Sequence, residues 1–150
     1  MAQQSTAKVT KEFLDSLYKN VKMGADSIID LMPKVKDQAM REEMTSELEK
    51  YEEFAKDIRD ILFKNGDEPK EESFMAKLGV KMGVIMNTMM DESVSHIADM
   101  MIKGATMGIT DTTKLVREYE NRSCSEEALA LAKKTIKYEQ ETIERLKKFL

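Results

Sequence analysis

The sequence predicts an all-α fold in which four long helices pack as an antiparallel bundle, with a short extra helix before the last long one. Apolar residues recur at three- and four-residue spacing through most of the 150 residues, which is the pattern of amphipathic helices. No stretch of useful length alternates in the manner of a strand. Turn signals at Pro33, at Gly66 and in the run NRSCS (121–125) leave short links, and short links favour antiparallel neighbours.

The first helix is predicted over residues 10–32. Residues 1–9 are polar and are expected to form a flexible N-terminus, after which Thr10 is a suitable N-cap. Gly24 lies on the inward face, where it would let another helix approach closely. Pro33 ends the helix, because proline disfavours a continuing helix on its N-terminal side. The apolar face contains Phe13, Leu17, Val21, Ile28 and Leu31.

The second helix is predicted over residues 37–65, with Asp37 as its N-cap and Gly66 as the residue that stops it. Its outer face is charged, which is typical of a solvated surface. Glu47 is different, because it lies at the edge of the apolar stripe. That stripe contains Met40, Met44, Leu48, Tyr51, Ala55, Ile58 and Leu62.

The third helix is predicted over residues 70–104 and is rich in methionine. Its apolar face is broad, so it should have neighbours on more than one side. Ser93 and His96 fall inside this face, where apolar residues would be expected. Gly104 and Gly108 then interrupt the helical pattern. The face contains Met75, Leu78, Met82, Ile85, Met86, Met89, Met90, Ile97, Met100 and Met101.

A short helix is predicted over residues 111–121, capped by Asp111 or by the threonine before it. The last long helix is predicted over residues 124–149, where Ser123 and Glu126 have capping-box spacing. Glu139 sits on the apolar stripe of this helix and is therefore the second carboxylate that we expect to face the core. The stripe contains Leu129, Ala132, Ile136, Ile143, Leu146 and Leu150.

The composition argues against several classes of function. The net charge is −4 and no basic block is present, which argues against nucleic-acid binding. No apolar run approaches the ~18 residues of a membrane span, and the N-terminus lacks the apolar core of a signal peptide. We therefore expect no membrane association, a cytoplasmic location and one domain over residues 10–150. The single cysteine, Cys124, fits a reducing compartment.

Two segments carry a resemblance to a known superfamily. The run SELEKYEEFAKDIRDILFKNGDEP (46–69) is similar to the second helix and following turn of ferritin-like proteins. The ending EEALALAKKTIKYEQETIERLKKFL (126–150) is similar to their fourth helix. The chain thus resembles small bacterial branches of the ferritin-like superfamily, and the resemblance implies a four-helix bundle for residues 10–150.

The metal motif of that superfamily is not present in its usual form. Di-iron members use a Glu from each of two helices and Glu-x-x-His from each of the other two. If Glu47 and Glu139 hold the Glu positions of the two Glu-x-x-His motifs, the His positions are occupied by Lys50 and Thr142. The resemblance therefore does not imply a di-iron centre or the oxidase chemistry that depends on one.

Binding of a divalent metal by a reduced ligand set is an alternative interpretation. Glu47, His96 and Glu139 are polar residues on inward faces, and Glu92 lies one turn before His96. If these side chains meet near the middle of the bundle, they could bind Zn²⁺, Mn²⁺ or Fe²⁺. The other interpretation is structural: His96 is buried and hydrogen-bonded to Glu47 or Glu139, because buried polar groups need partners.

Copper binding through methionine is a further alternative. The pairs that Met86 makes with Met82, Met89 and Met90 have helical spacings at which thioethers could hold Cu(I). Packing explains the same residues, because methionine is flexible and fills irregular cores.

Taken together, these features favour a non-catalytic helical-bundle protein that acts through self-association or a protein partner. No Gly-rich phosphate loop and no Ser/His/Asp arrangement is present, so we predict no catalytic residue and no cofactor other than a divalent metal. A homodimer is expected, in which the third helix supplies the contact through its broad face or through Val80, Val84 and Ile102. The predicted core contains Val21, Ile28, Leu48, Tyr51, Ile58, Leu62, Met82, Ile85, Met89, Ile97, Ile136 and Ile143.

Overall fold

A computed structural model describes residues 6–69, 72–84 and 93–150 of the chain. It contains five α-helices: α1 (Thr6–Leu31), α2 (Gln38–Lys64), α3 (Phe74–Val84), α4 (Val94–Tyr119) and α5 (Glu126–Leu146). Short 3₁₀ segments follow α1 (Met32–Lys34) and α5 (Lys147–Phe149). The described residues contain no strand, and the prediction of an all-α fold is confirmed.

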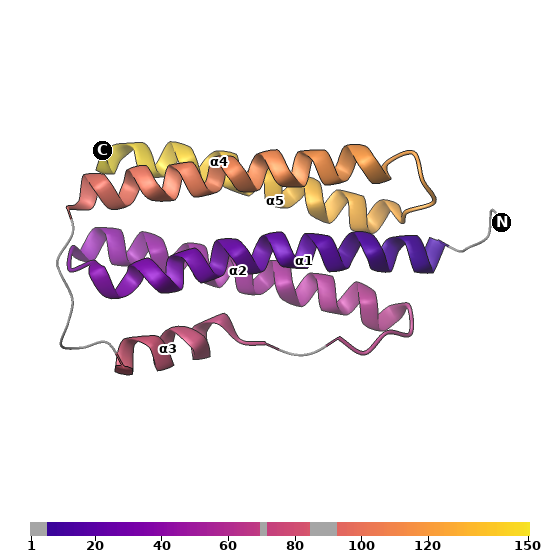
Figure 1. The fold of residues 1–150 in the computed structure, drawn as a ribbon, viewed down its shortest axis with the longest axis horizontal. Coiled ribbons are helices and arrows are strands. Elements are labelled where there is room, and N and C mark those ends of the chain that lie inside the picture. Colours follow the sequence, from indigo (N-terminus) through magenta and orange to yellow (C-terminus); the bar gives the residue numbers. More distant parts are fainter. Residues whose placement is uncertain (1–5, 70–71, 85–92) are drawn as a thin grey trace.

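The four long helices lie side by side as two hairpins (Figure 1). α1 and α2 form one hairpin, α4 and α5 form the other, and the hairpins meet where α1 packs on α4 and α2 packs on α5. Each of these neighbouring pairs runs antiparallel in Figure 1. α3 lies outside the four, against α1 and α2. α3 comes between the two hairpins in the sequence, and α2 and α4 run in the same direction.

α1 begins at Thr6, earlier than the predicted start at residue 10. Thr10 is therefore not an N-cap. It is fully buried within the helix, and its Oγ1 accepts a hydrogen bond from the backbone N–H of Ser125 at 2.9 Å. This bond joins the start of α5 to α1, which is why a polar residue occupies the inward face. The predicted end before Pro33 is confirmed, since α1 stops at Leu31.

Both predicted ends of α2 are confirmed. Asp37 is the N-cap, and its Oδ2 accepts from the backbone N–H of Met40 at 2.8 Å. Gly66 follows the helix with φ of +89°, a conformation that glycine adopts readily. The N–H of Gly66 bonds to Phe63 O and that of Asp67 to Leu62 O, each at 3.0 Å, which is the Schellman pattern that satisfies the last carbonyls of a helix.

The predictions of one third helix over 70–104 and of a short helix over 111–121 are wrong. The structure instead has the separate helix α3 and a single helix α4 that runs through both predicted segments. Ser93 starts α4 as its N-cap, because its Oγ accepts from the backbone N–H of His96 at 3.2 Å. Gly104 and Gly108, which look like helix breakers in the sequence, lie inside α4.

The capping box predicted for the last helix is also wrong. Ser125 is the N-cap of α5, with its Oγ accepting from the backbone N–H of Ala128 at 3.1 Å. Glu126 and Glu127 occupy the first turn, where negative charge is favourable near the helix N-terminus. The helix therefore starts two positions later than Ser123 would place it.

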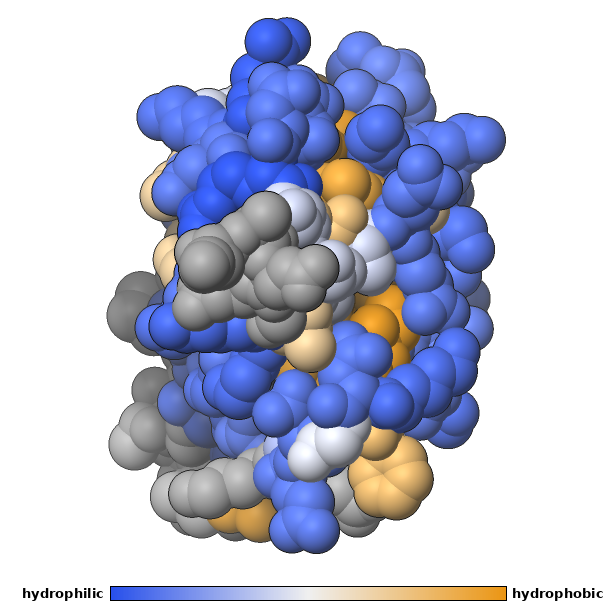
Figure 2. All heavy atoms as spheres, turned by 90° about the vertical axis from the view of Figure 1, so that its right-hand side faces the viewer, coloured by the Kyte–Doolittle hydropathy of each residue, from blue (hydrophilic) through white to orange (hydrophobic). Residues whose placement is uncertain are grey.

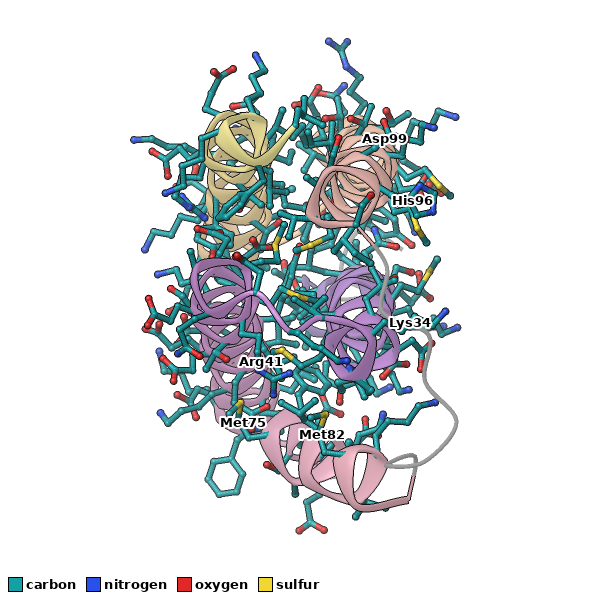
Figure 3. All side chains as sticks on the ribbon, turned by 90° about the vertical axis from the view of Figure 1, so that its left-hand side faces the viewer. Lys34, Arg41, Met75, Met82, His96 and Asp99 are labelled. Atoms are coloured by element: carbon teal, nitrogen blue, oxygen red, sulfur yellow. The ribbon has the colours of Figure 1, made fainter. Side chains whose placement is uncertain are left out.

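α3 is attached to the outside of the first hairpin by polar contacts and one buried ring. Glu52 of α2 accepts from Ser73 Oγ at 3.0 Å and from the backbone N–H of Phe74 at 2.9 Å, so it caps the start of α3. The Phe74 ring is fully buried. Lys77 pairs with Asp26 of α1 at 3.0 Å. Figure 3 shows Met82 on the side of α3 that faces α1 and α2.

Most of the predicted core is confirmed. Of the predicted core residues, those that are buried in the structure are Val21, Ile28, Leu48, Tyr51, Ile58, Leu62 and Ile97. Met82, Ile136 and Ile143 are only partly buried, whereas Ile85 and Met89 lie outside the described residues. The end of the molecule that holds the α4–α5 turn has a mainly hydrophilic surface, with apolar side chains gathered between the helices (Figure 2). None of the described helices is long and apolar enough to cross a membrane.

Candidate functional site

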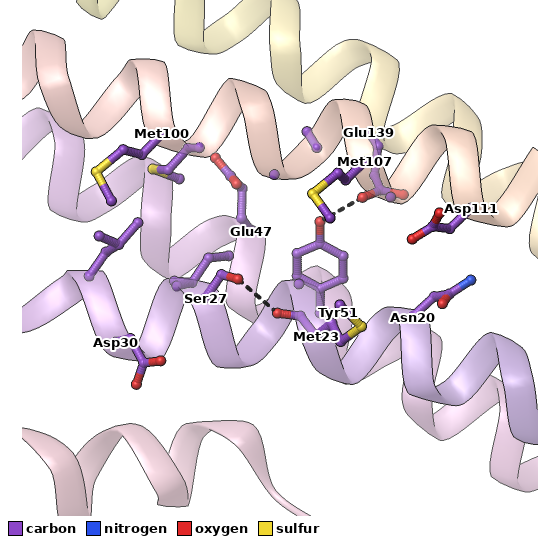
Figure 4. A pocket seen from close by; sticks show the side chains of 17 residues that line it. Asn20, Met23, Ser27, Asp30, Glu47, Tyr51, Met100, Met107, Asp111 and Glu139 are labelled. Carbon is purple, nitrogen blue, oxygen red and sulfur yellow. Dashed lines mark hydrogen bonds between the residues drawn. The ribbon is translucent and has the colours of Figure 1, made fainter.

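A cavity of about 350 Å³ lies between α1 and α4 and reaches inward to α2 and α5 (Figure 4). α1 contributes Gly24, Ser27 and Ile28 to its walls, among other residues, and α4 contributes Met101 and Ala105 among others. Side chains of α2 and α5 close the inner end. The cavity is therefore formed where the two hairpins meet, and it belongs to both of them.

Small residues on α1 and α4 leave room for this cavity. Gly104 lines it, and a Cβ built on Gly104 would meet no other atom within 4 Å. Gly24 and Gly108 serve a different purpose, because they admit side chains of the inner wall. A Cβ on Gly24 would lie 2.9 Å from Tyr51 Cζ, and one on Gly108 would lie 2.9 Å from Glu139 Cδ. The inference from sequence that Gly24 permits a close approach is correct, but the approaching group is a side chain.

Methionine side chains surround the opening of the cavity. Met23 of α1 is 56% exposed, and Met107 and Met100 of α4 are 60% and 38% exposed. Leaving such large apolar side chains in water is unfavourable, and methionine is flexible enough to close over an apolar guest of irregular shape. The rim therefore has the properties of an adaptable apolar surface.

Two buried carboxyl groups form the inner end of the cavity. Glu47 of α2 is 3% exposed and Glu139 of α5 is 6% exposed. The Tyr51 hydroxyl donates a hydrogen bond to Glu139 Oε2 at 3.2 Å. Glu47 Oε2 is buried and has no hydrogen-bond partner among the described residues. Figure 4 shows the Glu47 carboxyl group pointing toward α4.

Burial changes the protonation of both acids. It raises the pKa of Glu47 to about 10, and a hydrogen bond to Glu43 and the charge of Glu43 raise that pKa further. Burial also raises the pKa of Glu139 to about 7, against the lowering effect of the Tyr51 hydrogen bond and together with the charge of Asp111. At neutral pH, Glu47 is therefore a neutral acid and Glu139 is close to its midpoint.

A charged pair lies behind Glu47, on the side away from the cavity. Arg145 Nε is 3.2 Å from Glu43 Oε2, and its guanidinium lies over the Tyr138 ring at 5.0 Å from the ring centre. Burial would raise the pKa of Glu43, but the hydrogen bond from Glu47 and the charge of Arg145 outweigh it and lower that pKa. Glu43 is thus the ionised acceptor, and protonated Glu47 is its donor.

The structure bears out part of the predicted polar set and corrects the rest. Glu47 and Glu139 are buried as expected and line one cavity. The prediction that His96 is buried is wrong, because it is exposed in the first turn of α4 and lies on the outer side of that helix (Figure 3). The reason is that Ser93 is the N-cap of α4, so His96 falls in the exposed first turn of the helix and not on an inward face. Glu92 lies outside the described residues.

The metal hypotheses are not tested by this arrangement. Among the described residues, no group of three or more His, Cys, Asp or Glu side chains is placed to hold a metal ion. Glu92 is not among the described residues, and neither are Met86, Met89 and Met90 of the copper hypothesis. Both hypotheses therefore stay predictions.

Several residues of the cavity could not have been singled out from the sequence. Tyr51 looked like an ordinary core residue, yet its hydroxyl holds Glu139. Met23 and Met107 are not part of the predicted apolar faces. Glu47 and Glu139 were predicted correctly from the sequence, because each is an acidic residue within an apolar stripe.

Comparisons of the chain with protein-family models, with curated proteins and with solved structures found no match.

Proposed function

We propose that this chain is a non-catalytic helical-bundle protein that binds a small, mainly apolar organic molecule in the cavity between α1 and α4. The observation that supports the proposal is one cavity with an exposed methionine rim and an unpartnered buried carboxyl oxygen, that of Glu47, at its inner end. Its volume of about 350 Å³ falls within the common range for ligand sites, which are mostly apolar and carry a few polar groups.

The apolar walls supply the affinity in this proposal. A ligand that removes ~200 Å² of apolar surface from water gains about 5 kcal/mol before the entropy of association is subtracted. Met100 and Met107 rise from α4 at the opening and would cover the outer part of such a ligand. The polar groups at the inner end would fix its orientation.

A ferritin-like four-helix bundle is the fold that we propose for the four long helices. Two antiparallel hairpins joined by one long crossover are the connectivity of ferritin-like bundles, and here the parallel helices α2 and α4 are consecutive long helices with α3 between them in the sequence. The inward placement of Glu47 on α2 and Glu139 on α5 supports the same proposal, since these are the helices to which the resemblance assigns the Glu positions.

Self-association also remains part of the proposal. Val80 on α3 is 69% exposed, which supports a contact with a second copy on this side of the molecule. Ile102 is partly buried against the core, so it would contribute less than the sequence indicates. Sedimentation equilibrium of the wild-type chain and of Val80→Lys checks this point, and a monomer for both at tens of micromolar would rule it out.

The ligand proposal is tested with N-phenyl-1-naphthylamine, a fluorophore that is uncharged at neutral pH and brightens in apolar surroundings. We expect saturable binding of one molecule per chain. Gly104→Leu should weaken that binding by about tenfold or more, because the added side chain occupies the cavity. Gly79→Leu is the matched control, since Gly79 lies on α3 and a Cβ there also meets no atom within 4 Å.

Two results would contradict the proposal. One is the absence of saturable binding to the wild-type chain. The other is equal binding by the wild-type chain and Gly104→Leu, which would place the probe elsewhere on the surface.

A further inference from the structure

We propose that the ligand is a lipophilic amine whose protonated nitrogen lies between the carboxyl groups of Glu47 and Glu139, with its apolar part under the methionine rim. This inference rests on the function proposed above and names the class of molecule that the cavity accepts.

The charge of the cavity favours a cation. Among the described residues that line it, the charged types are Asp30, Glu47, Asp111 and Glu139, and none is basic. Asp30 already pairs with Lys81 of α3 at 3.2 Å, and Glu47 is protonated at neutral pH, so the charge argument depends on Asp111 and Glu139. An anionic ligand would meet only acids there, whereas a cation would meet the negative charge of Asp111 and of the ionised fraction of Glu139.

The hydrogen-bonding groups at the inner end require a donor. Glu47 Oε2 is buried without a partner, and leaving a buried polar atom unpaired is unfavourable. The Tyr51 hydroxyl supplies only one bond, to Glu139. A primary ammonium group carries three N–H donors and no acceptor. It can therefore donate to Glu47 Oε2 and still has N–H donors left for a second acceptor, whereas a hydroxyl group has one proton to donate.

The placement of the two acids on different helices suits a compact cation. Glu47 comes from α2 and Glu139 from α5, and Gly108 of α4 makes room for the Glu139 carboxyl group. Hydrogen bonds from an ammonium to a carboxylate or to a neutral carboxyl oxygen are charge-assisted, and such bonds are stronger than bonds between neutral groups. The Tyr51 ring also lines the cavity, and aromatic faces attract cations.

The apolar part of the ligand follows from the remaining walls. Ile28 and Leu31 of α1 and Met101 of α4 line the middle of the cavity. The exposed rim methionines cover its mouth. An alkyl or arylalkyl chain attached to the amine would fill this part, so small hydrophilic amines such as methylamine should bind poorly.

The test is displacement of N-phenyl-1-naphthylamine by three molecules of equal chain length: octylamine, octanol and octanoate. We expect octylamine to compete at about tenfold lower concentration than octanol, because the charged head group gains two charge-assisted bonds. Octanoate should be the weakest competitor. This ranking needs only the wild-type chain, so it does not depend on any variant being able to fold.

Two variants then locate the head group. Glu47→Gln and Glu139→Gln should each reduce the advantage of octylamine over octanol, a ratio measured within each variant so that any change in probe affinity cancels. Glu141→Gln, on an exposed position of α5, is the matched control and should leave the advantage intact.

The outcomes separate the two proposals. Saturable probe binding with octylamine no better than octanol would overturn the amine assignment and leave the ligand-binding function standing. An amine advantage that survives in both Gln variants would place the nitrogen away from these acids and would also overturn it. If the probe does not bind at all, both proposals fall.

Discussion

The hydroxyl of Tyr51 lies 3.2 Å from Glu139 Oε2 and joins α2 to α5 at the inner end of the cavity. Two glycines on the opposite helices make this bond possible. Gly24 leaves space for the Tyr51 ring, and Gly108 leaves space for the Glu139 carboxyl group. The pair is thus set between two positions where any larger residue would collide with it.

The substitutions Gly104→Ala and Gly108→Ala in α4 should change the stability of the chain in opposite directions. Gly108→Ala should destabilise the chain by ~1–3 kcal/mol, because the new methyl group would displace the Glu139 carboxyl. Gly104→Ala should stabilise it by about 0.5–1 kcal/mol, since alanine is the better helix former and nothing lies within 4 Å. Urea unfolding measures both. The same sign for both variants would mean that α4 packs on α5 differently.

Tyr51→Phe should destabilise the chain by ~1–3 kcal/mol, because Glu139 loses its hydrogen-bond donor in a buried site. The pKa of Glu139 should rise further, since the Tyr51 hydrogen bond lowers it. Chemical denaturation gives the first quantity, and the pH dependence of stability gives the second. Tyr138→Phe is the control, because no hydrogen bond from its hydroxyl to Glu139 is present in this structure. An effect of Tyr138→Phe as large as that of Tyr51→Phe would contradict the assignment.

Glu139 should make stability fall as pH rises from 4.5 to 7. Its pKa is raised to about 7 in the fold from an ordinary value of 4.5, so the folded chain holds this proton more tightly than the unfolded chain does. The contribution of Glu139 to the free energy of unfolding is therefore complete below pH 4.5 and is lost by the time the pH exceeds 7. The difference between the two pKa values corresponds to about 3 kcal/mol.

Glu139→Gln should remove the part of the pH-dependent loss of stability that comes from Glu139, as measured by urea unfolding at several pH values between 4.5 and 8. Glu47 contributes a decline of the same sign that extends to higher pH, so some dependence should remain in the variant. Glu141→Gln should behave as wild type. An unchanged profile for Glu139→Gln would show that its carboxyl group is not protonated by burial.

Ser93→Ala should destabilise the chain by about 1 kcal/mol, because it removes the N-cap of α4. Ser125→Ala should have an effect of similar size at the start of α5. A helix that continued through residue 93 would give the opposite sign, since alanine favours helix interiors. Thermal or urea unfolding of Ser93→Ala therefore distinguishes the observed helix boundary from the continuous third helix that the periodicity predicts.

The sequence is sufficient to predict the end of α1 and both ends of α2, because these three positions carry local signals. Pro33 stops α1, Asp37 starts α2 and Gly66 stops it, and each acts on backbone groups within a few residues. Glu47 and Glu139 were also predictable as inward acids, since each interrupts an apolar stripe. These features depend on neighbours along the chain and on little else.

The features of the fold and the site that the sequence did not predict depend on contacts between residues far apart in the chain. The sequence indicates that Gly108 breaks a helix, whereas in the structure it makes room for Glu139 within α4. The sequence indicates that Thr10 is an N-cap, whereas in the structure it accepts a hydrogen bond from Ser125. The methionine-rich run has helical spacing on both sides of Ser93, so periodicity alone indicates one long helix, and the misplaced boundary put His96 on the wrong face.

The single crossing of the chain between the hairpins has a consequence for assembly. If two copies exchanged their α4–α5 hairpins, α1 and α2 of one copy would meet α4 and α5 of the other, and the contacts between hairpins would be rebuilt. Such a dimer needs no new surface, because the contact between hairpins serves equally within one chain or across two. Each cavity would then take its α1 wall from one copy and its α4 wall from the other.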